Sequence, residues 1–343
     1  MRLGEQLVIQ EASVWDYGED SALREDVKRV LVTGAHGFIG KNLIDLLCSR
    51  NWKVVAGVRR EPGALVRLGV QFEQLILLKE PERWQFALRS VDCVVHLAGR
   101  AHKLGRAGDD AEAFNEVNVL GASFVARQAV EAGVKRFILL SSIKVNGEGG
   151  ASLVYRAEDV PKPEDAYGRS KLAAEIAIRE ICARGGVEYV ILRPPLVYGP
   201  GVGANFRRLM RLVELGIPLP FGSINNRRSL VGIRNLMDFI ETSMVHPEAV
   251  GKTWLVSDGQ DLSTRELVNR LARLMFRRPS LFPFPPSFLR FAASCLGRRG
   301  EMERLTGSLQ VDTNPAAACL NWRPPVSVDD GLAETVATYK LGG

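Results

Sequence analysis

The sequence predicts an α/β protein built on a doubly wound parallel sheet, with a smaller C-terminal α/β lobe. Over roughly the first 190 residues, short β-branched runs alternate with amphipathic helical patterns. A glycine-rich turn joins the first of these runs to the first helix, and the alternation breaks down after Arg193, where glycine and proline become dense. Apolar runs without polar alternation are typical of parallel strands that helices cover on both faces.

Six apolar runs are expected to be strands of this sheet. They are Val30–Thr33, Val54–Val58, Leu75–Leu78, Cys93–Leu97, Phe137–Leu140 and Tyr189–Leu192. Between them apolar residues recur at helical spacing, as in the segment from Ile39 to Leu47. We therefore divide the chain into an N-terminal extension (1–27), a sheet domain (28–193) and a mainly substrate-binding lobe (194–343), from which segments can return to the sheet.

Composition excludes several classes of protein. The chain has 343 residues, 46% hydrophobic and 24% charged, which is typical of globular domains. No apolar run approaches the roughly 20 residues of a membrane-spanning helix, and the N-terminus lacks the pattern of a signal peptide, so we expect a cytoplasmic protein. Five scattered cysteines without C-x-x-C spacing argue against disulfides and a metal site. The basic pairs lack aromatic interleaving, so we expect no nucleic-acid partner.

One segment has an ambiguous pattern. Residues 281–299 are apolar, rich in proline and end in two arginines. Such a pattern is compatible with weak peripheral contact of an interfacial helix with a membrane surface. It is more typical of core packing or of a dimer face.

The glycine-rich turn predicts a dinucleotide site. The first strand runs into Thr33-Gly34-Ala35-His36-Gly37-Phe38-Ile39-Gly40, a G-x-x-G-x-x-G pattern that opens a helix. Glycines at these positions allow a tight turn, close approach of a pyrophosphate to backbone amides, and close packing of helix on strand. The sheet domain over 28–193 is therefore predicted to bind a dinucleotide.

The end of the second strand indicates which dinucleotide. NAD-specific proteins usually place a carboxylate there to accept hydrogen bonds from the adenosine ribose. This chain has Arg59 and Arg60 instead. Since a guanidinium binds a 2′-phosphate that a carboxylate would repel, we predict that NADP(H) is favoured and that NAD(H) can also bind.

A second motif predicts acid–base chemistry. Tyr167 and Lys171 are four residues apart, one turn along a helix and on the same face. A neighbouring ammonium favours the phenolate of a tyrosine, whose ordinary pKa is near 10. Ser142 follows the strand Phe137–Leu140, at the carboxyl edge of the sheet where ligands bind, and is a second hydroxyl that can orient a substrate oxygen.

Together these motifs resemble the extended short-chain dehydrogenase/reductases, the group of nucleotide-sugar epimerases, dehydratases and reductases, over roughly residues 28–340. The matching stretches are TGAHGFIG, HLAG (96–99), NVLG (118–121), SSIKVNG (141–147), Tyr167 with Lys171, and RPPLVYGPG (193–201). The resemblance implies a Rossmann-type domain and a set of site residues. The catalytic residues implied are Ser142, Tyr167, Lys171 and Asn118. The cofactor-binding residues implied are Gly34, His36, Gly37, Phe38, Ile39, Gly40, Arg59, Arg60, Leu97, Ala98, Gly99 and Lys171. The substrate-binding residues implied are Ser142, Lys144, Tyr167, Asn205 and Arg228, of which the last two match positions that contact the sugar diphosphate.

The resemblance also bears on the reaction. The 4,6-dehydratases of this group place Asp-Glu directly after the catalytic hydroxyl residue, where this chain has Ile143 and Lys144. The stretches SSIKVNGE, PEDAYGRSKLAAE and GSLQVD resemble bacterial reductases that convert UDP-2-acetamido-2,6-dideoxy-4-hexulose to UDP-N-acetylquinovosamine or its fucosamine epimer for O-antigen or capsule synthesis. The alternative is a UDP-glucose or UDP-N-acetylglucosamine 4-epimerase with tightly bound NAD. The family also implies a homodimer, with Ala111–Glu131 and Tyr167–Ala183 as the candidate interface helices.

Overall fold

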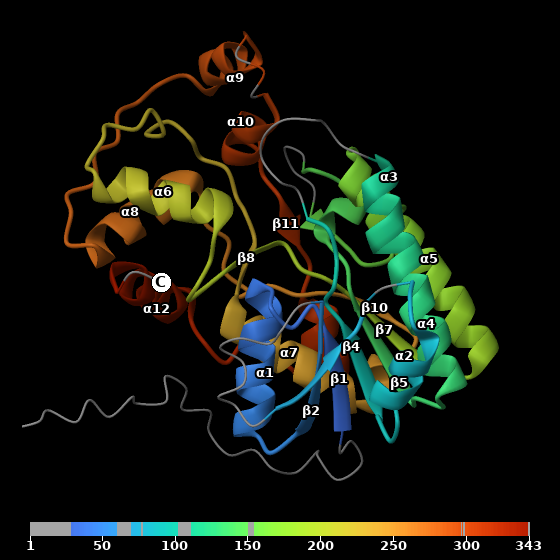
Figure 1. The fold of residues 1–343 in the computed structure, drawn as a ribbon. Helices are drawn as coiled ribbons and strands as arrows, with labels where there is room; N and C mark the ends of the chain where they lie inside the picture. The colour runs from blue at the N-terminus through green and yellow to red at the C-terminus, as the bar shows by residue number, and fades with distance from the viewer. Residues whose placement is uncertain are drawn as a thin grey trace, which may run out of the picture.

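The computed structural model describes residues 29–59, 70–76, 78–101, 111–149, 154–295, 297 and 299–341. The extension expected over residues 1–27 and the expected cofactor ligand Arg60 lie outside this range. Figure 1 shows a central sheet covered by helices on both faces, with a second group of helices and short strands above it.

Seven parallel strands form the central sheet, in the order β10-β7-β5-β4-β1-β2-β3. They are β1 (Arg29–Thr33), β2 (Lys53–Val58), β3 (Gln71–Gln74), β4 (Cys93–His96), β5 (Arg136–Leu140), β7 (Glu188–Arg193) and β10 (Thr253–Leu255). The strand order reverses between β1 and β4, and such a reversal is where doubly wound sheets bind ligands, at the carboxyl ends of the strands. The predicted doubly wound parallel sheet is confirmed.

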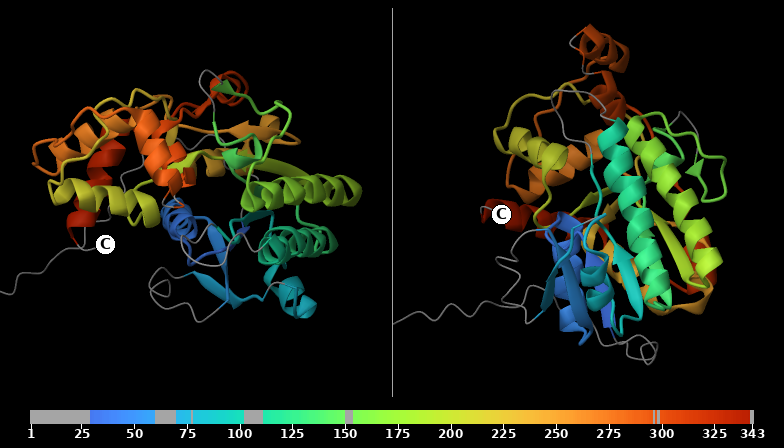
Figure 2. Two further views of the ribbon diagram at one scale, coloured as in Figure 1. Left: turned by 90° about the horizontal axis from the view of Figure 1, so that it is seen from above. Right: turned by 45° about the vertical axis from the view of Figure 1, so that its right-hand side comes forward.

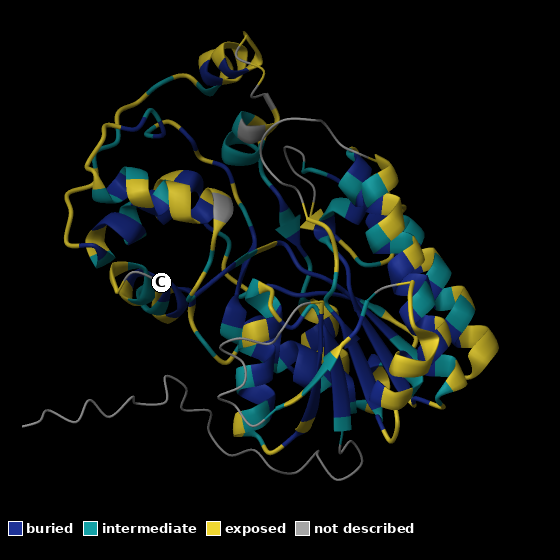
Figure 3. Ribbon diagram, viewed as in Figure 1, coloured by how far each residue is buried: buried dark blue, intermediate teal, exposed yellow. Residues whose placement is uncertain are grey.

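Two layers of helices bury the two faces of the sheet (Figures 1 and 2). One layer consists of α1 (Phe38–Ser49) and α7 (Ile233–Val245), and the other of α2 (Pro81–Ala87), α4 (Ala122–Glu131) and α5 (Ala166–Gly185). Successive strand residues point to opposite layers, so that Val30 and Val32 join the first core while Leu31 joins the second. The inner strands β1, β4 and β5 are therefore almost wholly buried (Figure 3), as the absence of polar alternation in the sequence predicts.

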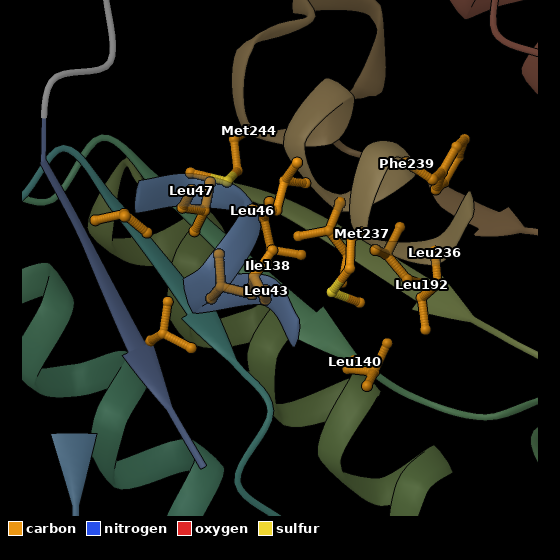
Figure 4. Packing of buried hydrophobic residues seen from close by; sticks show 14 of the residues in the cluster. Leu43, Leu46, Leu47, Ile138, Leu140, Leu192, Leu236, Met237, Phe239 and Met244 are labelled. Carbon is orange, nitrogen blue, oxygen red and sulfur yellow. The ribbon is translucent and has the colours of Figure 1, made fainter. Parts of the chain in front are cut away.

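Figure 4 shows how the first of these cores is packed. Leucines of α1 lie between the strand side chains and the apolar face of α7. The labelled residues are Leu43, Leu46, Leu47, Ile138, Leu140, Leu192, Leu236, Met237, Phe239 and Met244. Since α7 comes from beyond residue 193, the C-terminal part of the chain supplies half of the cover on this face.

The strand predicted over Leu75–Leu78 is wrong in position. The structure places β3 at Gln71–Gln74 instead, at the edge of the sheet, where its residues are only partly buried or exposed. Leu75 is buried just after the strand and donates its backbone N–H to the carbonyl of Val58, 2.8 Å away, whereas Leu78 has φ 63° and cannot be extended. An edge strand is exposed to solvent along one side. It therefore carries fewer apolar residues than the segment 75–78 that follows it here.

Segments after residue 193 go to two places. The strand β10, the helix α7 and the helix α11 (Asn314–Leu320) join the central sheet and its first core. The helices α6 (Ala204–Glu214), α8 (Thr264–Leu274) and α12 (Val328–Lys340) pack into a separate core beside the two-stranded pair β8 (Leu196–Tyr198) and β9 (Leu230–Gly232). The chain thus crosses between the sheet and the lobe several times.

The remaining elements are short. They are α3 (Ala111–Phe114), the π-helix η2 (Asn115–Gly121), the 3-10 helices η3 (Ile143–Val145) and η4 (Pro247–Ala249), the paired strands β6 (Val154–Tyr155) and β11 (Gln310–Val311), and the helices α9 (Pro286–Cys295) and α10 (Arg299–Thr306). Within the described residues, no helix has both the length and the apolar character needed to cross a membrane.

Candidate active site

The glycine turn lies between β1 and α1 and admits no larger residues at two of its positions. Gly34 has φ 71°, and a Cβ placed on it would lie 2.8 Å from the backbone nitrogen of Ala98. A Cβ on Gly40 would lie 2.3 Å from the carbonyl oxygen of Gly34. Gly37 is the N-cap residue of α1, and it makes no side-chain hydrogen bond to the first N–H groups of the helix. These features fit a pyrophosphate at the helix N-terminus.

The other predicted cofactor residues lie around this turn. His36 is exposed, Phe38 and Ile39 are half-buried at the start of α1, and Leu97, Ala98 and Gly99 follow β4 directly beside β1. The hydroxyl of Thr33 joins the two strand ends, because it accepts the backbone N–H of Ala98 at 3.2 Å. Arg59 is exposed at the carboxyl end of β2. All of these residues are therefore at one edge of the sheet.

A buried histidine also lies at this edge. His96 contacts the Thr33 hydroxyl through Nδ1 at 2.9 Å and stacks on Phe137 with ring centroids 5.9 Å apart. Burial, with a smaller effect of the Lys171 charge, lowers the pKa of His96 to about 3, so its imidazole is neutral. The Thr33 hydroxyl and Nδ1 of the neutral imidazole share one hydrogen bond, while the buried Nε2 has no hydrogen-bond partner among the described residues. His96 therefore packs the sheet beneath the site and does not act as an acid or base.

Ser142, Tyr167 and Lys171 come together just beyond the end of β5. The Ser142 hydroxyl hydrogen-bonds with the Tyr167 phenol, and it also caps η3 by accepting the backbone N–H of Lys144 at 3.3 Å. Tyr167 lies in the first turn of α5, edge-on to the ring of Phe114 at 5.9 Å between centroids. The Lys171 ammonium is buried and donates to the carbonyl of Leu140 at 2.8 Å.

The pKa values in this group follow from burial. Burial raises the pKa of Tyr167 to about 12, which the hydrogen bond from Ser142 partly opposes and the charge of Asp165 reinforces. Burial lowers the pKa of Lys171 to about 8, which the charge of Glu175 partly opposes. The Lys171 ammonium is directed to the Leu140 carbonyl, and its effect on the pKa of the phenol stays a prediction. Tyr167 holds its proton at neutral pH.

Asn118 holds two chain segments together. Its Oδ1 accepts the backbone N–H of Arg100 at 2.7 Å, while its Nδ2 donates to the Arg100 carbonyl at 3.1 Å and to the Ser170 hydroxyl at 2.9 Å. Both protons of the amide and one lone pair of its oxygen are thus used within the protein. Asn118 lies in the π-helix η2, a distortion that often marks functional sites. In this structure the side chain connects α5 to the loop after β4, and a catalytic role of Asn118 stays a prediction.

An ion pair behind the three residues connects α5 to β7. Glu175 lies on α5 one turn beyond Lys171 and forms two hydrogen bonds with the guanidinium of Arg193. Glu175 also accepts the hydroxyl of Ser141, the residue before Ser142. Arg193 in turn donates to the side chain of Asn146 at 2.9 Å. This buried network fixes α5 against the carboxyl ends of β5 and β7.

Lys144 has carboxylate partners within the protein. Its ammonium pairs with Glu148 at 2.6 Å and with Asp165. Asp165 caps α5 by accepting the backbone N–H of Gly168 at 2.6 Å. The structure therefore uses Lys144 to anchor the start of the helix that carries Tyr167, and it places no free carboxylate directly after Ser142.

Two arginines of the C-terminal lobe lie close enough for their charges to interact. Arg228 is half-buried and donates to the carbonyl of Gly307 at 3.0 Å. Burial, together with the charge of Arg304, lowers the pKa of Arg228 to about 10, while the charge of Glu148 raises it. The Nε of Arg304 is buried without a hydrogen-bond partner among the described residues. Partly desolvated guanidinium groups favour an anionic ligand.

The structure does not bring every predicted residue into this group. Asn205 is exposed in the first turn of α6, and no described contact joins it to Ser142 or Tyr167. Within the described part of the chain, no cluster of three His, Cys, Asp or Glu side chains could hold a metal ion.

Comparison with known proteins shows the family to which the chain belongs. The sequence pattern of the group described as "NAD dependent epimerase/dehydratase family" matches residues 30–257. The chain belongs to this family. The match covers the glycine turn, the segment from Ser142 to Lys171 and Arg228.

Relatives of this epimerase/dehydratase family member differ in their reactions. A UDP-glucose 4-epimerase of Vibrio cholerae is 40% identical over 328 residues, covering 92% of this chain and 97% of the relative. A GDP-6-deoxy-D-mannose reductase of Pseudomonas aeruginosa is 25% identical over 325 residues, covering 91% of this chain and 97% of the relative. The predicted relation to UDP-glucose 4-epimerases is thus confirmed, while these names include both epimerisation and reduction.

Solved structures share the fold. A UDP-glucuronic acid 4-epimerase from Bacillus cereus, in complex with UDP-glucuronic acid and NAD, has a TM-score of 0.75 at 22% identity over 92% of this chain and 100% of that one. MoeE5, in complex with UDP-glucuronic acid and NAD, has a TM-score of 0.72 at 26% identity, with 92% of this chain and 100% of that one covered. Both neighbours bind NAD, so they lend no support to the predicted preference for NADP(H).

Several residues that shape the site of this family member escaped the sequence analysis. Glu175, Asp165, Glu148 and Arg304 were not singled out, and Arg193 was noted only within a motif. Glu175 follows Lys171 at helical spacing, which places it on the same helix face and is a usable signal. Arg304 has no such local signal, because it meets Arg228 only through the folding of the lobe.

Proposed function

We propose that this chain is an oxidoreductase that transfers hydride at C4 of a UDP-sugar, and that it reduces the 4-keto group of a UDP-4-keto-6-deoxy-N-acetylhexosamine. The product would be UDP-N-acetylquinovosamine or its fucosamine epimer, made in the cytoplasm for O-antigen or capsule. The grouping of Ser142, Tyr167 and Lys171 beside the glycine turn carries the proposal, since these residues meet where the family binds its cofactor.

The residues of the glycine turn, with Leu97, Ala98 and Gly99, would hold the dinucleotide, and Lys171 would contact its nicotinamide ribose. When bound, the reduced cofactor supplies the hydride for C4. Ser142 and Tyr167 would hydrogen-bond to the C4 carbonyl oxygen and so stabilise the charge that develops on it. Tyr167 would then donate its phenolic proton to that oxygen.

The protonation state of Tyr167 is compatible with this reaction. A phenol with a pKa of about 12 holds its proton at neutral pH and can serve as the acid of a reduction. Arg59 at the end of β2 supports an exchangeable NADPH, as a reductase needs, because a guanidinium can pair with the 2′-phosphate.

Arg228 and Arg304 would bind the diphosphate of the UDP-sugar. Glu148 links Arg228 to the residues next to Ser142. The charge of its carboxylate raises the pKa of Arg228, and the same carboxylate pairs with Lys144. Asn205 would contact the nucleotide from the start of α6. Lys144 and Asp165 pair with each other, and no acidic residue directly follows Ser142. These residues therefore do not supply the additional acid that a dehydratase needs to eliminate water.

The alternative function is a UDP-glucose or UDP-N-acetylglucosamine 4-epimerase with tightly bound NAD. The observation in its favour is the 40% identity to the epimerase of Vibrio cholerae along nearly the whole of both chains. The same Ser142, Tyr167 and Lys171 would act in both reactions.

One assay separates the two functions. We would follow oxidation of NADPH and NADH by the purified chain with UDP-2-acetamido-2,6-dideoxy-4-hexulose, made in the same tube by a separate dehydratase, and with UDP-N-acetylglucosamine alone as control. Oxidation that depends on the keto-sugar and is lost in Tyr167→Phe would support the reductase. No oxidation, with interconversion of UDP-N-acetylglucosamine and its galacto epimer without added cofactor, would establish the epimerase.

We also propose a homodimer that forms through η2 and α5. Both elements pack against α4 on the same face of the sheet. Each carries an exposed apolar side chain, Leu120 in η2 and Ile176 in α5. Light scattering on the purified chain tests this, and a monomeric mass that Ile176→Glu leaves unchanged would contradict it.

A further inference from the structure

The helix α9 has an apolar face that no described residue covers. Phe288 and Phe291 are 63% and 70% exposed. With Ala292 and Cys295, which are also exposed, they occupy one face of the helix at spacings of three, four and seven residues. We call these four residues the α9 face. Exposed aromatic groups gathered in this way usually mark a contact surface.

A different face of α9 attaches it to the protein. Leu289 and Ala293 are buried, and Leu289 belongs to the core of the C-terminal lobe. Phe284 connects the helix to the preceding loop, since its ring lies edge-on to both Phe282 and Phe288 at 6.3 Å between centroids. The α9 face is thus presented outward by a helix that is held in place, so the segment 281–299 is not simply part of the core.

The position of α9 makes this face accessible to a large flat partner. Figures 1 and 2 place α9 at an extremity of the molecule, with α10 between it and the central sheet. Figure 3 shows most of its surface as exposed. A flat partner can therefore contact α9 without first meeting the sheet domain.

The charge around α9 indicates which partner this is. Between Glu266 and Glu301 the sequence contains seven arginines and no acidic residue. Arg290 is exposed on the polar side of α9, and Arg277 and Arg278 are exposed in the loop that leads to it. The described carboxylate nearest in sequence, Glu303, belongs to α10, which lies between α9 and the central sheet. A helix with phenylalanines on one face and arginine on another, in a segment of one charge sign, is typical of an element that lies on an anionic lipid surface.

We propose that α9 docks the protein peripherally on anionic phospholipid membranes, with Phe288 and Phe291 inserted at the headgroup boundary. Arg290 and the neighbouring arginines add electrostatic attraction to the lipid charge. The contact is reversible, because ten helical residues bury little apolar area in a bilayer. This inference does not depend on the proposed reaction, since it concerns a surface on the far side of α10.

Vesicle sedimentation of the full-length chain tests the proposal. Vesicles of phosphatidylcholine and phosphatidylglycerol at 3:1 are compared with phosphatidylcholine alone, in low and high salt. We expect binding to the anionic vesicles that weakens in high salt, since salt screens surface charge. The double variant Phe288→Ser/Phe291→Ser should lower the partition coefficient at least about tenfold, and Arg290→Glu about fivefold or more.

The matched control is Phe86→Ser, which removes a phenylalanine of similar exposure, 55%, from α2 on the sheet domain. It should leave vesicle binding unchanged, and circular dichroism should show that all variants are folded. Failure of the wild-type chain to bind anionic vesicles would overturn the proposal, as would equal losses in Phe86→Ser and the double variant. If light scattering instead shows that the double variant changes from dimer to monomer without any vesicle binding, the face is covered by a second copy and the membrane proposal is wrong.

Discussion

Arg193 and Glu175 form a buried two-point ion pair between β7 and α5, with Nε to Oε1 at 2.9 Å and Nη2 to Oε2 at 2.6 Å. Their side chains are 3% and 1% exposed. The pair sets the position of α5 one turn beyond Lys171, and through Ser141 it also contacts the strand end that carries Ser142. The geometry of the proposed catalytic residues therefore depends on two residues that touch neither substrate nor cofactor.

Replacing Glu175 with glutamine should destabilise the protein. The variant leaves the Arg193 charge buried without a counter-ion, and breaking a buried pair in this way typically costs about 3 to 5 kcal/mol. Urea unfolding measures the change in the free energy of unfolding. The control Glu180→Gln removes an exposed partner of Arg184 on the same helix and should change stability by less than about 0.5 kcal/mol. Equal effects of the two variants would contradict the role given to the pair.

Tyr167→Phe should abolish most of the turnover while leaving the fold intact. The phenol is the only group in the proposed mechanism that gives its proton to the substrate oxygen, and loss of such a general acid typically lowers kcat by about 10² to 10⁴. Ser142→Ala should lower kcat by about 10² or more, because it removes one donor to the developing charge. Both are measured by cofactor oxidation, with thermal unfolding as the check on folding. Turnover near the wild-type level in Tyr167→Phe would exclude the mechanism.

The buried Lys171 should make stability depend on pH in a defined direction. Its pKa is about 8 in the folded protein and ordinarily 10.5, so between these values the unfolded chain binds more protons. The stability of the wild type relative to Lys171→Met should therefore rise as pH increases from 8 to 10.5 and should be constant below about 7. Urea unfolding of both proteins at pH 7 and pH 10 measures this difference. A pH-independent difference would show that the ammonium is not desolvated.

Arg59 should set the choice between the two cofactors. If its guanidinium pairs with the 2′-phosphate, Arg59→Ala should raise the Kd for NADPH about tenfold and leave that for NADH within about twofold, since a charge-assisted hydrogen bond contributes about 1.5 kcal/mol or more. Titration calorimetry with each cofactor gives both constants. Arg89→Ala, which removes another exposed arginine, is the control. Equal weakening of both cofactors would reject the proposed preference.

Arg304 should contribute to binding of the UDP moiety. Arg304→Met keeps much of the apolar stem and removes the charge, so the Kd for UDP should rise about tenfold or more. Arg270→Met removes an arginine of the same lobe that pairs with Asp329, and it should leave the Kd unchanged. An unchanged Kd for UDP in Arg304→Met would mean that the diphosphate does not meet this pair of arginines.

The edge strand shows where reasoning from apolar runs reaches its limit. β3 is Gln71–Gln74, although the more apolar run is residues 75–78. A strand inside the sheet is selected by apolar side chains on both faces, whereas one at the edge is selected by its pairing with β2, here from Val55 to Val58. That pairing depends on the register of the sheet and not on local composition.

The sequence by itself determined the features that depend on neighbours along the chain. The glycine turn, the helix that follows it and the four-residue spacing of Tyr167 and Lys171 are local, because backbone geometry converts their spacing directly into position. The family and the doubly wound sheet follow from the order of such units. Only the tertiary structure decided that Asn118 would hold Arg100 and Ser170, that Glu175 would pair with Arg193, and that Arg304 would approach Arg228. These residues are far apart in sequence, and the packing of separate helices and strands, which no local pattern encodes, brings them into contact.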